Sequence, residues 1–228
     1  MGGSQPVWLF DLDNTLHNAS HAAFGFINQG MSDYIVRELG VSRSHADELR
    51  QRYWKRYGTT MLGLLRHHGV QARHFLEHTH ALPGLEERVH SHPHDVAVLR
   101  RLRGRRYILT NAPLSYAMRV LQALGIAHLF DGVLSIEDMR MFGHWRPKPD
   151  ARMLRRTVAA LRVHPSRCIL VEDALEHQKA ARRVGMRTVW MQRWARGAGG
   201  RTVASEPRCC RPAYVDRRIS RLRDLLRK

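Results

Sequence analysis

Cysteine and long apolar runs are both scarce in this sequence. It has three cysteines, Cys168, Cys209 and Cys210, which are too few for a disulfide framework and lack the spacing of metal ligands. No apolar run approaches the roughly 20 residues that a membrane helix needs. The first residues lack the charged and apolar regions of a signal peptide, and Pro6 stands where a myristoylation site requires serine or threonine. We therefore expect a cytoplasmic protein.

Acidic side chains are also few, with 20 Asp and Glu against 38 Lys and Arg and a net charge of +18. Clustered basic side chains can neutralise nucleic-acid phosphates. Here the arginines are scattered through every expected element, without a helix-turn-helix, zinc-finger or aromatic RNA-binding pattern. The charge alone therefore does not predict dedicated nucleic-acid binding, although it favours the attraction of small anionic substrates. The sequence carries no signal for an oligomeric state.

Apolar residues recur at three- and four-residue spacing between Ser20 and His80, which predicts a run of helices. The expected helices cover residues 23–39, 44–58, 61–69 and 72–82. Ser44 is the expected N-cap of the second helix, and Gly58 its stop. Pro83 and Gly84 break the run.

Strands and helices alternate after Pro93. The expected strands are 107–111, 132–135, 168–173 and 188–191, separated by helices at 95–104, 114–125, 151–162 and 175–185. Val7 to Phe10 is a short apolar run that belongs to the same sheet. This alternation is typical of right-handed βαβ units, so we expect an α/β fold with a Rossmann-like parallel sheet and helices on both faces.

The helical run is therefore an insertion in the α/β core. A chain of 228 residues has room for one sizeable core and one such subdomain. We assign residues 1–16 and 93–228 to the core and 17–92 to an inserted helical cap. Residues 195–213 are rich in Gly, Ala and Arg and are expected to form a loop or connector. A docked final helix is expected from the spacing of Ile219, Leu222, Leu225 and Leu226.

Polar residues follow several of the expected strands, or precede the next helix. They are Asp11, Asp13, Thr110, Asn111, Lys148, Glu172 and Asp173. Singly, each is typical of a turn or a helix cap. Together they would converge at the carboxyl ends of a parallel sheet, where ligands bind. Four carboxylates gathered there would repel one another, and a bound Mg²⁺ would relieve that repulsion.

These segments resemble the four motifs of the haloacid dehalogenase-like superfamily of phosphohydrolases. The motifs are "DLDNT", "LTN", "KP" and "VED", in this order, and the helical insertion resembles the cap of subclass I members. The stretches "YWKRYGTTMLGLLRHHG" and "GMRTVWM" resemble the pyrimidine 5'-nucleotidase branch. The resemblance runs from about Val7 to Trp194, and His177 departs from it, because many relatives carry asparagine there.

The resemblance implies roles that agree with the chemistry of the residues. Asp11 would attack phosphorus to give an aspartyl-phosphate, and Asp13 would act as the general acid and base. Thr110, the Asn111 amide and Lys148 would hold the phosphoryl oxygens. The Mg²⁺ ligands would be the Asp11 carboxylate, the Asp13 backbone carbonyl and Asp173, with Glu172 acting through water.

The expected activity is Mg²⁺-dependent hydrolysis of a small phosphorylated metabolite, with pyrimidine nucleoside 5'-monophosphates favoured. Tyr57, Thr59 and Thr60 would border the pocket for the base, although aromatic residues at helical spacing also serve to pack a cap. A broad sugar-phosphate phosphatase and a phosphomutase share the same motifs and stay open. A silent module that binds nucleic acid through its arginines is a further alternative, which the intact motif residues disfavour.

Overall fold

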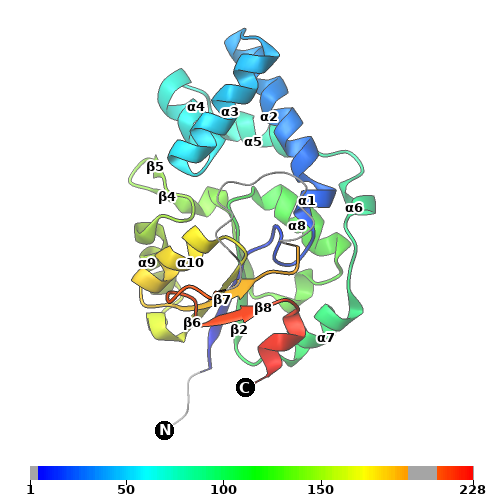
Figure 1. Ribbon diagram of the computed structural model, residues 1–228, viewed down its shortest axis with the longest axis vertical. Coiled ribbons are helices and arrows are strands. Elements are labelled where there is room, and N and C mark those ends of the chain that lie inside the picture. Colours follow the sequence, from blue (N-terminus) through cyan, green and yellow to red (C-terminus); the bar gives the residue numbers. More distant parts are fainter. Residues whose placement is uncertain (1–4, 195–209, 228) are drawn as a thin grey trace.

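A six-stranded parallel sheet forms the centre of the protein. The computed structural model describes residues 5–194 and 210–227. The strand order is β3-β2-β1-β6-β7-β8, and every neighbouring pair is parallel. Along the chain the strands are β1 (Val7–Phe10), β2 (Arg105–Leu109), β3 (Gly132–Leu134), β6 (Cys168–Glu172), β7 (Arg187–Met191) and β8 (Arg217–Ile219) (Figure 1). The Rossmann-like α/β class predicted from the alternation is confirmed.

Successive strand residues point to opposite faces of the sheet, and helices cover both faces. Trp8 and Phe10 pack on one face with the helices α7 (Pro93–Arg101) and α8 (Leu114–Ala123) and the 3₁₀ turn η4 (Leu222–Leu226). Val7 and Leu9 pack on the other face with α9 (Ala151–Ala160) and α10 (Leu175–Arg183). Because β1 is buried on both faces, it is apolar throughout rather than alternating.

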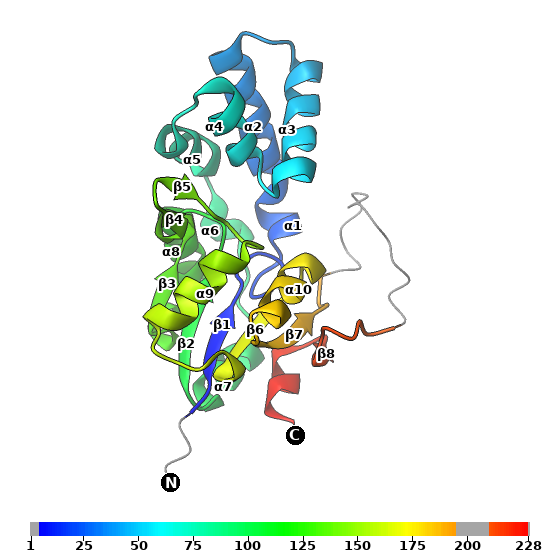
Figure 2. The ribbon, with the colours of Figure 1, turned by 90° about the vertical axis from the view of Figure 1, so that its left-hand side faces the viewer.

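Seven helices lie between β1 and β2. The last of them, α7, packs on the sheet, and the other six belong to the expected insertion. They are α1 (Ala19–Ala22), α2 (Phe24–Leu39), α3 (Arg43–Tyr57), α4 (Thr60–His68), α5 (Ala72–His80) and α6 (Leu85–Arg88). In Figure 2, α2 to α5 form a separate layer above the sheet, as expected of an inserted helical cap. Gly58 ends α3 in the left-handed conformation, as predicted. The N-cap of α3 is Ser42, whose hydroxyl accepts from the His45 N–H, so the assignment to Ser44 was wrong.

The end of the chain differs from the predicted final helix. Arg217–Ile219 forms β8 beside β7, and Leu222–Leu226 forms a short 3₁₀ turn. The predicted apolar positions Ile219, Leu222 and Leu225 are nevertheless buried. The pattern identified the buried side chains, but the hydrogen bonds offered by the edge of β7 decided the backbone conformation. Of the predicted connector 195–213, residues 195–209 lie outside the described residues.

A second, two-stranded sheet was not predicted. It consists of the antiparallel strands β4 (Arg140–Met141) and β5 (His144–Trp145). Two-residue strands are too short to give an alternating pattern. No helix among the described residues has the length and apolar character to cross a lipid bilayer.

Candidate active site

The buried ammonium group of Lys148 lies between two carboxylates. Its Nζ donates to Asp11 Oδ1 at 2.6 Å and to Glu172 Oε2 at 2.8 Å. Asp11 directly follows β1 and Glu172 ends β6, and these strands are neighbours in the sheet. Lys148 and Glu172 are each 1% exposed. Charged groups buried to this degree require such partners.

This pairing sets the charges of the three groups. Burial alone would lower the pKa of Lys148, but the charges of Asp11 and Glu172 outweigh it and hold the pKa above its usual range. Burial would raise the pKa of Glu172, yet Lys148 and His177 hold it below its usual range. Burial and the charge of Glu172 raise the pKa of Asp11 to about 7, against the attraction of Lys148. One lysine therefore does not neutralise the site.

Asp173 adds a third carboxylate to the same place. Asp11, Glu172 and Asp173 each present an oxygen atom within 4.8 Å of the others. Burial and the charges of Glu172 and Asp11 raise the pKa of Asp173 well above its usual range. The site thus holds an excess of negative charge that a cation would relieve. A donor set made only of carboxylate oxygens fits Mg²⁺ better than a softer metal.

Thr110 and Asn111 follow β2, on the other side of β1. Thr110 is buried, and its hydroxyl accepts from the Ala112 N–H at 3.0 Å. The Asn111 side chain holds the backbone of Lys148: its Nδ2 donates to the Lys148 carbonyl at 3.0 Å, and its Oδ1 accepts from the Lys148 N–H at 2.9 Å. This side chain is therefore committed to positioning the lysine. The role of holding an anion, expected of Asn111 from the sequence, would therefore fall to its backbone N–H.

Asp13 contacts different groups from Asp11. The Tyr116 hydroxyl donates to Asp13 Oδ1 at 2.7 Å, and His17 Nε2 lies 2.9 Å from the same oxygen. Burial and the charge of Asp13 raise the pKa of Tyr116 well above its usual range, which keeps the hydroxyl protonated as a donor. The His17 side chain is 1% exposed and that of Asp13 19%. Asp13 is thus held from the protein side while remaining open to solvent.

The inserted helices reach this group through His80, the last residue of α5. Its ring meets that of Tyr116 edge-on, with the centroids 5.7 Å apart. Desolvation lowers the pKa of His80 to about 4, although the charge of Asp13 opposes the shift. We call Asp13, His17, Tyr116 and His80 the Asp13 cluster. Of these four residues, only Asp13 is predicted from the sequence, and the one local signal for the others is a histidine four positions after it.

His177, on α10, is the second basic neighbour of Glu172. Its Nδ1 lies 3.0 Å from Glu172 Oε2, the oxygen that also accepts from Lys148. The sequence marked His177 as a departure from the family pattern. The structure places that departure beside a carboxylate of the acidic site, where it adds to the forces that hold Glu172 ionised.

The turn between α3 and α4 lies against the segment that carries Lys148. A Cβ atom on Gly58 would lie 3.8 Å from Pro149 Cδ and 4.0 Å from the Lys148 carbonyl oxygen. Tyr57 precedes this turn and Thr59 follows it, so both lie next to residues that approach the acidic site.

The three cap residues singled out from the sequence are not equally available. The Tyr57 hydroxyl lies 2.6 Å from His67 Nε2, and the side chain is half-buried. The Thr59 hydroxyl accepts from the Leu62 N–H at 3.3 Å and caps α4. Thr60 is 4% exposed and donates to the Arg50 carbonyl at 3.1 Å, so its hydroxyl is used inside the cap. A direct role for Thr60 at the substrate does not fit this position.

Comparison with known families agrees with the site. The family model of haloacid dehalogenase-like hydrolases matches residues 7–185, well over half of the chain. This protein is a hydrolase of the haloacid dehalogenase-like family. The match includes every motif residue of the acidic site, from Asp11 to Asp173.

Two curated relatives are similar over part of their length. Phosphate metabolism protein 8 of Saccharomyces cerevisiae is 28% identical over 141 residues, which are 57% of this chain and 43% of that protein. Validoxylamine A 7'-phosphate phosphatase of Streptomyces hygroscopicus subsp. limoneus is 34% identical over 79 residues, 35% of each chain. The aligned segments span less than half the length of either relative.

Solved structures show the same fold over nearly the whole chain. A HAD phosphatase from Thermococcus onnurineus superposes with a TM-score of 0.61 at 23% identity and covers 97% of this chain and 96% of its own. CbbY from Rhodobacter sphaeroides, solved in complex with phosphate, gives 0.61 at 20% identity with the same coverage. At 23% and 20% identity, these two structures show that the fold is shared, and the family model assigns the chain to the haloacid dehalogenase-like hydrolases.

Proposed function

We propose that the protein is a Mg²⁺-dependent phosphomonoesterase that works through an aspartyl-phosphate on Asp11 and acts on pyrimidine nucleoside 5'-monophosphates. The observation that carries the proposal is the buried group of Asp11, Lys148 and Glu172 with Asp173 beside it. Such an arrangement concentrates a nucleophile and a cation at one point, and phosphoryl transfer depends mainly on positioning and charge stabilisation.

In the first step, a carboxylate oxygen of Asp11 attacks phosphorus and the bond from phosphorus to the ester oxygen breaks. Asp13 gives its proton to the departing alcohol. In the second step, Asp13 takes a proton from water, the water oxygen bonds to phosphorus, and the bond to Asp11 breaks to release inorganic phosphate. Lys148 and the Asn111 N–H are suited to hold the phosphoryl oxygens, and Thr110 lies beside them.

Asp11, Asp173 and Glu172 would hold Mg²⁺, together with the backbone carbonyl of Asp13. When bound, Mg²⁺ supplies positive charge that offsets the phosphate oxygens and the crowded carboxylates. Lys148 stays protonated throughout, because its pKa lies above the usual range.

The choice of a pyrimidine nucleotide rests on the cap. The α3–α4 turn lies against the Lys148 segment, and Tyr57 and Thr59 flank Gly58 of that turn, which supports their assignment to the pocket for the leaving group. A planar ring and a hydroxyl suit a small base, and a pocket sized for one ring would exclude a purine. The sequence resemblance to the pyrimidine 5'-nucleotidase branch supports the same choice.

Phosphate release from a panel of substrates tests the proposal. Uridine, cytidine, adenosine and guanosine 5'-monophosphates, several sugar phosphates and a small aryl phosphate are compared with Mg²⁺ and with a chelator. We expect kcat/KM for the pyrimidine nucleotides to exceed that for the purine nucleotides by about tenfold, or about 1.4 kcal/mol. Asp11→Asn removes the attacking oxyanion, so it is expected to abolish turnover of every substrate, and the protein should stay folded because Lys148 keeps Glu172 as a partner.

A broad phosphatase of small phosphorylated molecules is the second candidate. It is favoured by the similarity to a protein named as a phosphatase of validoxylamine A 7'-phosphate. Equal kcat/KM for adenosine and uridine 5'-monophosphates, or higher values for sugar phosphates, would reject the pyrimidine assignment and support this alternative. Mg²⁺-independent turnover, or turnover by Asp11→Asn, would instead reject the mechanism.

A further inference from the structure

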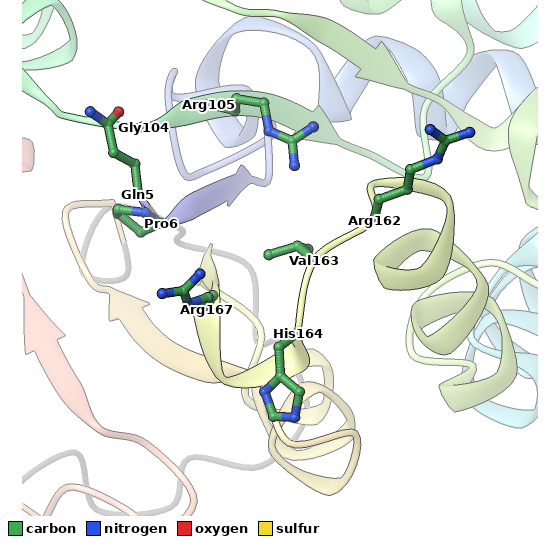
Figure 3. A pocket seen from close by; sticks show the side chains of 8 residues that line it. All are labelled: Gln5, Pro6, Gly104, Arg105, Arg162, Val163, His164 and Arg167. Atoms are coloured by element: carbon green, nitrogen blue, oxygen red, sulfur yellow. The ribbon is translucent and has the colours of Figure 1, made fainter. Parts of the chain in front are cut away.

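A basic cavity lies at the amino ends of the central strands, at the end of the sheet opposite the acidic site. Its volume is about 410 Å³. It is lined by Gln5, Pro6, Gly104, Arg105, Arg162, Val163, His164 and Arg167 (Figure 3). We call it the basic pocket. β1, β2 and β6 begin beside it; Asp11 and Thr110 directly follow the first two, and Glu172 ends the third. Strands of four or five residues, about 15 Å long, therefore separate the basic pocket from the acidic site.

The strand register builds this pocket. Val7 of β1 pairs with Arg105 of β2 and with Cys168 of β6. Pro6, Gly104 and Arg167 each come one residue before these partners and therefore lie at one level of the sheet, with Arg105 one residue further along β2. Gly104 has a φ of +102°, and a Cβ atom there would lie 2.1 Å from the Pro6 carbonyl oxygen. Only glycine permits this close approach, so backbone atoms of Pro6 and Gly104 form the wall of the basic pocket between β1 and β2.

The charge of the pocket has one sign. Arg105 begins β2, Arg162 follows α9, and Arg167 ends the 3₁₀ turn η3 (Pro165–Arg167). Figure 3 shows Arg162 and Arg167 on either side of Val163, with Arg105 above them in this view. Arg105 is oriented by a hydrogen bond of 2.7 Å to the Leu161 carbonyl. Within residues 5–194 and 210–227, none of the three arginines forms an ion pair, and the lining includes no Asp or Glu.

We propose that the basic pocket is a second anion-binding site, which takes a small polyphosphate. The planar guanidinium group presents several donors and binds phosphate oxygens in pairs. Three such groups around one cavity provide more charge than a single phosphate needs, which favours a ligand with two or three linked phosphates. The volume lies within the range of small-molecule sites.

The shape argues for a small ligand over a nucleic acid. A nucleic-acid surface presents basic residues as a stripe or an extended patch that follows the backbone. Here the arginines surround a cavity: Arg167 and Val163 are half-buried, while Arg105 and Arg162 are exposed. A half-buried charge is screened less than one on an open surface, so the contribution of Arg167 should persist at moderate salt.

Calorimetric titration with inorganic tripolyphosphate tests the proposal, on the full chain in chelator at 0.15 M salt. Without Mg²⁺ the acidic site repels this anion, so we expect one ligand per chain at the basic pocket. Arg105→Gln and Arg167→Gln should each weaken binding by about tenfold or more, because each removes a charged donor. Arg52→Gln on α3 is the matched control: it removes the same charge from an exposed position in the cap and should change Kd by less than about twofold.

Two further measurements separate ligand binding at the pocket from a loss of folding and from nucleic-acid binding. Arg167 donates no side-chain hydrogen bond to the described part of the chain, so Arg167→Gln should keep the parent melting temperature, and the loss of binding then reports the ligand contact alone. A single-stranded oligonucleotide should bind more weakly than tripolyphosphate and should be insensitive to the two pocket variants. The proposal is overturned if tripolyphosphate does not saturate, if the pocket variants bind like Arg52→Gln, or if the oligonucleotide is the tighter ligand through the same arginines.

Discussion

At the scale of single residues, Lys148 and the acids around it form one electrostatic unit. The lysine is buried and holds Asp11 and Glu172 at 2.6 and 2.8 Å. Its removal would leave two carboxylates in a site from which water is largely excluded. Breaking a buried ion pair by deleting one partner costs about 3 to 5 kcal/mol, because the remaining charge has no compensation.

Lys148→Met tests this unit. We expect the free energy of unfolding in chelator to fall by about 3 kcal/mol, and phosphatase activity to be lost. Adding Glu172→Gln removes one of the stranded charges and should restore part of the stability without restoring activity. Urea denaturation of the two variants and the parent measures both effects. A Lys148→Met protein as stable as the parent would contradict the electrostatic coupling.

Tyr116 is expected to position Asp13 rather than to touch the substrate. Tyr116→Phe removes the 2.7 Å hydrogen bond, and we expect kcat on nucleotides to fall about tenfold with KM little changed. The loss should be smaller for an aryl phosphate whose leaving group needs no proton. Tyr34→Phe is the matched control, since it removes a hydroxyl bonded to His74 from an equally buried ring in the cap. If kcat fell equally on nucleotides and on the aryl phosphate, Tyr116 would have a structural role only and would not position Asp13 for proton transfer.

Some residues of the site can be predicted from the sequence, and others become apparent only in the structure. Asp11, Glu172 and Asp173 could be predicted because each lies at the end of an apolar strand, and parallel strands end together. Tyr116 is separated from Asp13 by 103 positions and lies within a helix whose apolar spacing resembles that of any amphipathic helix. Its role depends on the packing of α8 against the sheet, which periodicity does not encode. The same holds for the clamp that Asn111 forms on Lys148, 37 positions away.

At the scale of elements, the cap depends on a close approach of α3 and α4. A Cβ atom on Gly63 would lie 2.1 Å from Cγ of Tyr53, so the tyrosine ring packs directly on the α4 backbone. Tyr53 is buried and its hydroxyl lies 2.7 Å from His68 Nε2. The turn between these helices is the one that contacts the Lys148 segment, so their packing sets the position of the cap over the site.

Gly63→Ala should disturb this arrangement. We expect the free energy of unfolding to fall by about 1 to 3 kcal/mol from overpacking. In the proposed function the cap faces the leaving group, so kcat/KM should fall more on nucleotides than on an aryl phosphate. Gly25→Ala in α2 is the control, since no atom lies within 4 Å of the added methyl and the helix gains up to about 1 kcal/mol. Thermal melts and the two kinetic assays measure the outcome. If Gly63→Ala matched Gly25→Ala in melting temperature and in both kinetic assays, the contact between Gly63 and the Tyr53 ring would not exclude a side chain.

Elements were predictable where local pattern and tertiary environment agree. The short apolar runs of β1 and β6 predicted buried strands, and the apolar spacing within α2, α3 and α9 predicted helices. Arg217–Ile219 had no such local preference. Its conformation is decided by hydrogen bonds with β7, including Gln192 N–H to the Ile219 carbonyl at 2.9 Å, which only the assembled sheet provides.

At the scale of the whole molecule, the net charge and the acidic site have opposite effects on stability as the pH rises. The protein carries a net charge of +18, so raising the pH through the histidine range reduces its self-repulsion. In the metal-free site the pKa of Asp11 is about 7 and that of Asp173 lies well above its usual range, mainly through burial. The folded state therefore binds more protons at these groups than the unfolded state between about pH 4 and 7.

The sign follows from that difference in bound protons. Stability changes with pH in proportion to protons bound by the unfolded state minus those bound by the folded state, so these two carboxyls lower stability as the pH rises. Glu172 acts oppositely, but its pKa is lowered and its contribution is complete above about pH 5. A cation that binds the ionised carboxylates should cancel the loss, and its effect should grow with pH because fewer protons have to be displaced.

Melting temperatures at pH 5.5 and 8.0, with chelator and with Mg²⁺, measure this effect. We expect the stabilisation by Mg²⁺ to be larger at pH 8.0, where Asp11 is mostly ionised. Asp11→Asn combined with Asp173→Asn removes both groups with raised pKa but keeps the histidines and arginines, so it serves as the background. In chelator this variant should gain stability relative to the parent as the pH rises, and Mg²⁺ should have no effect on it at either pH. A Mg²⁺ increment equal at both pH values in the parent would contradict the excess negative charge that defines the site.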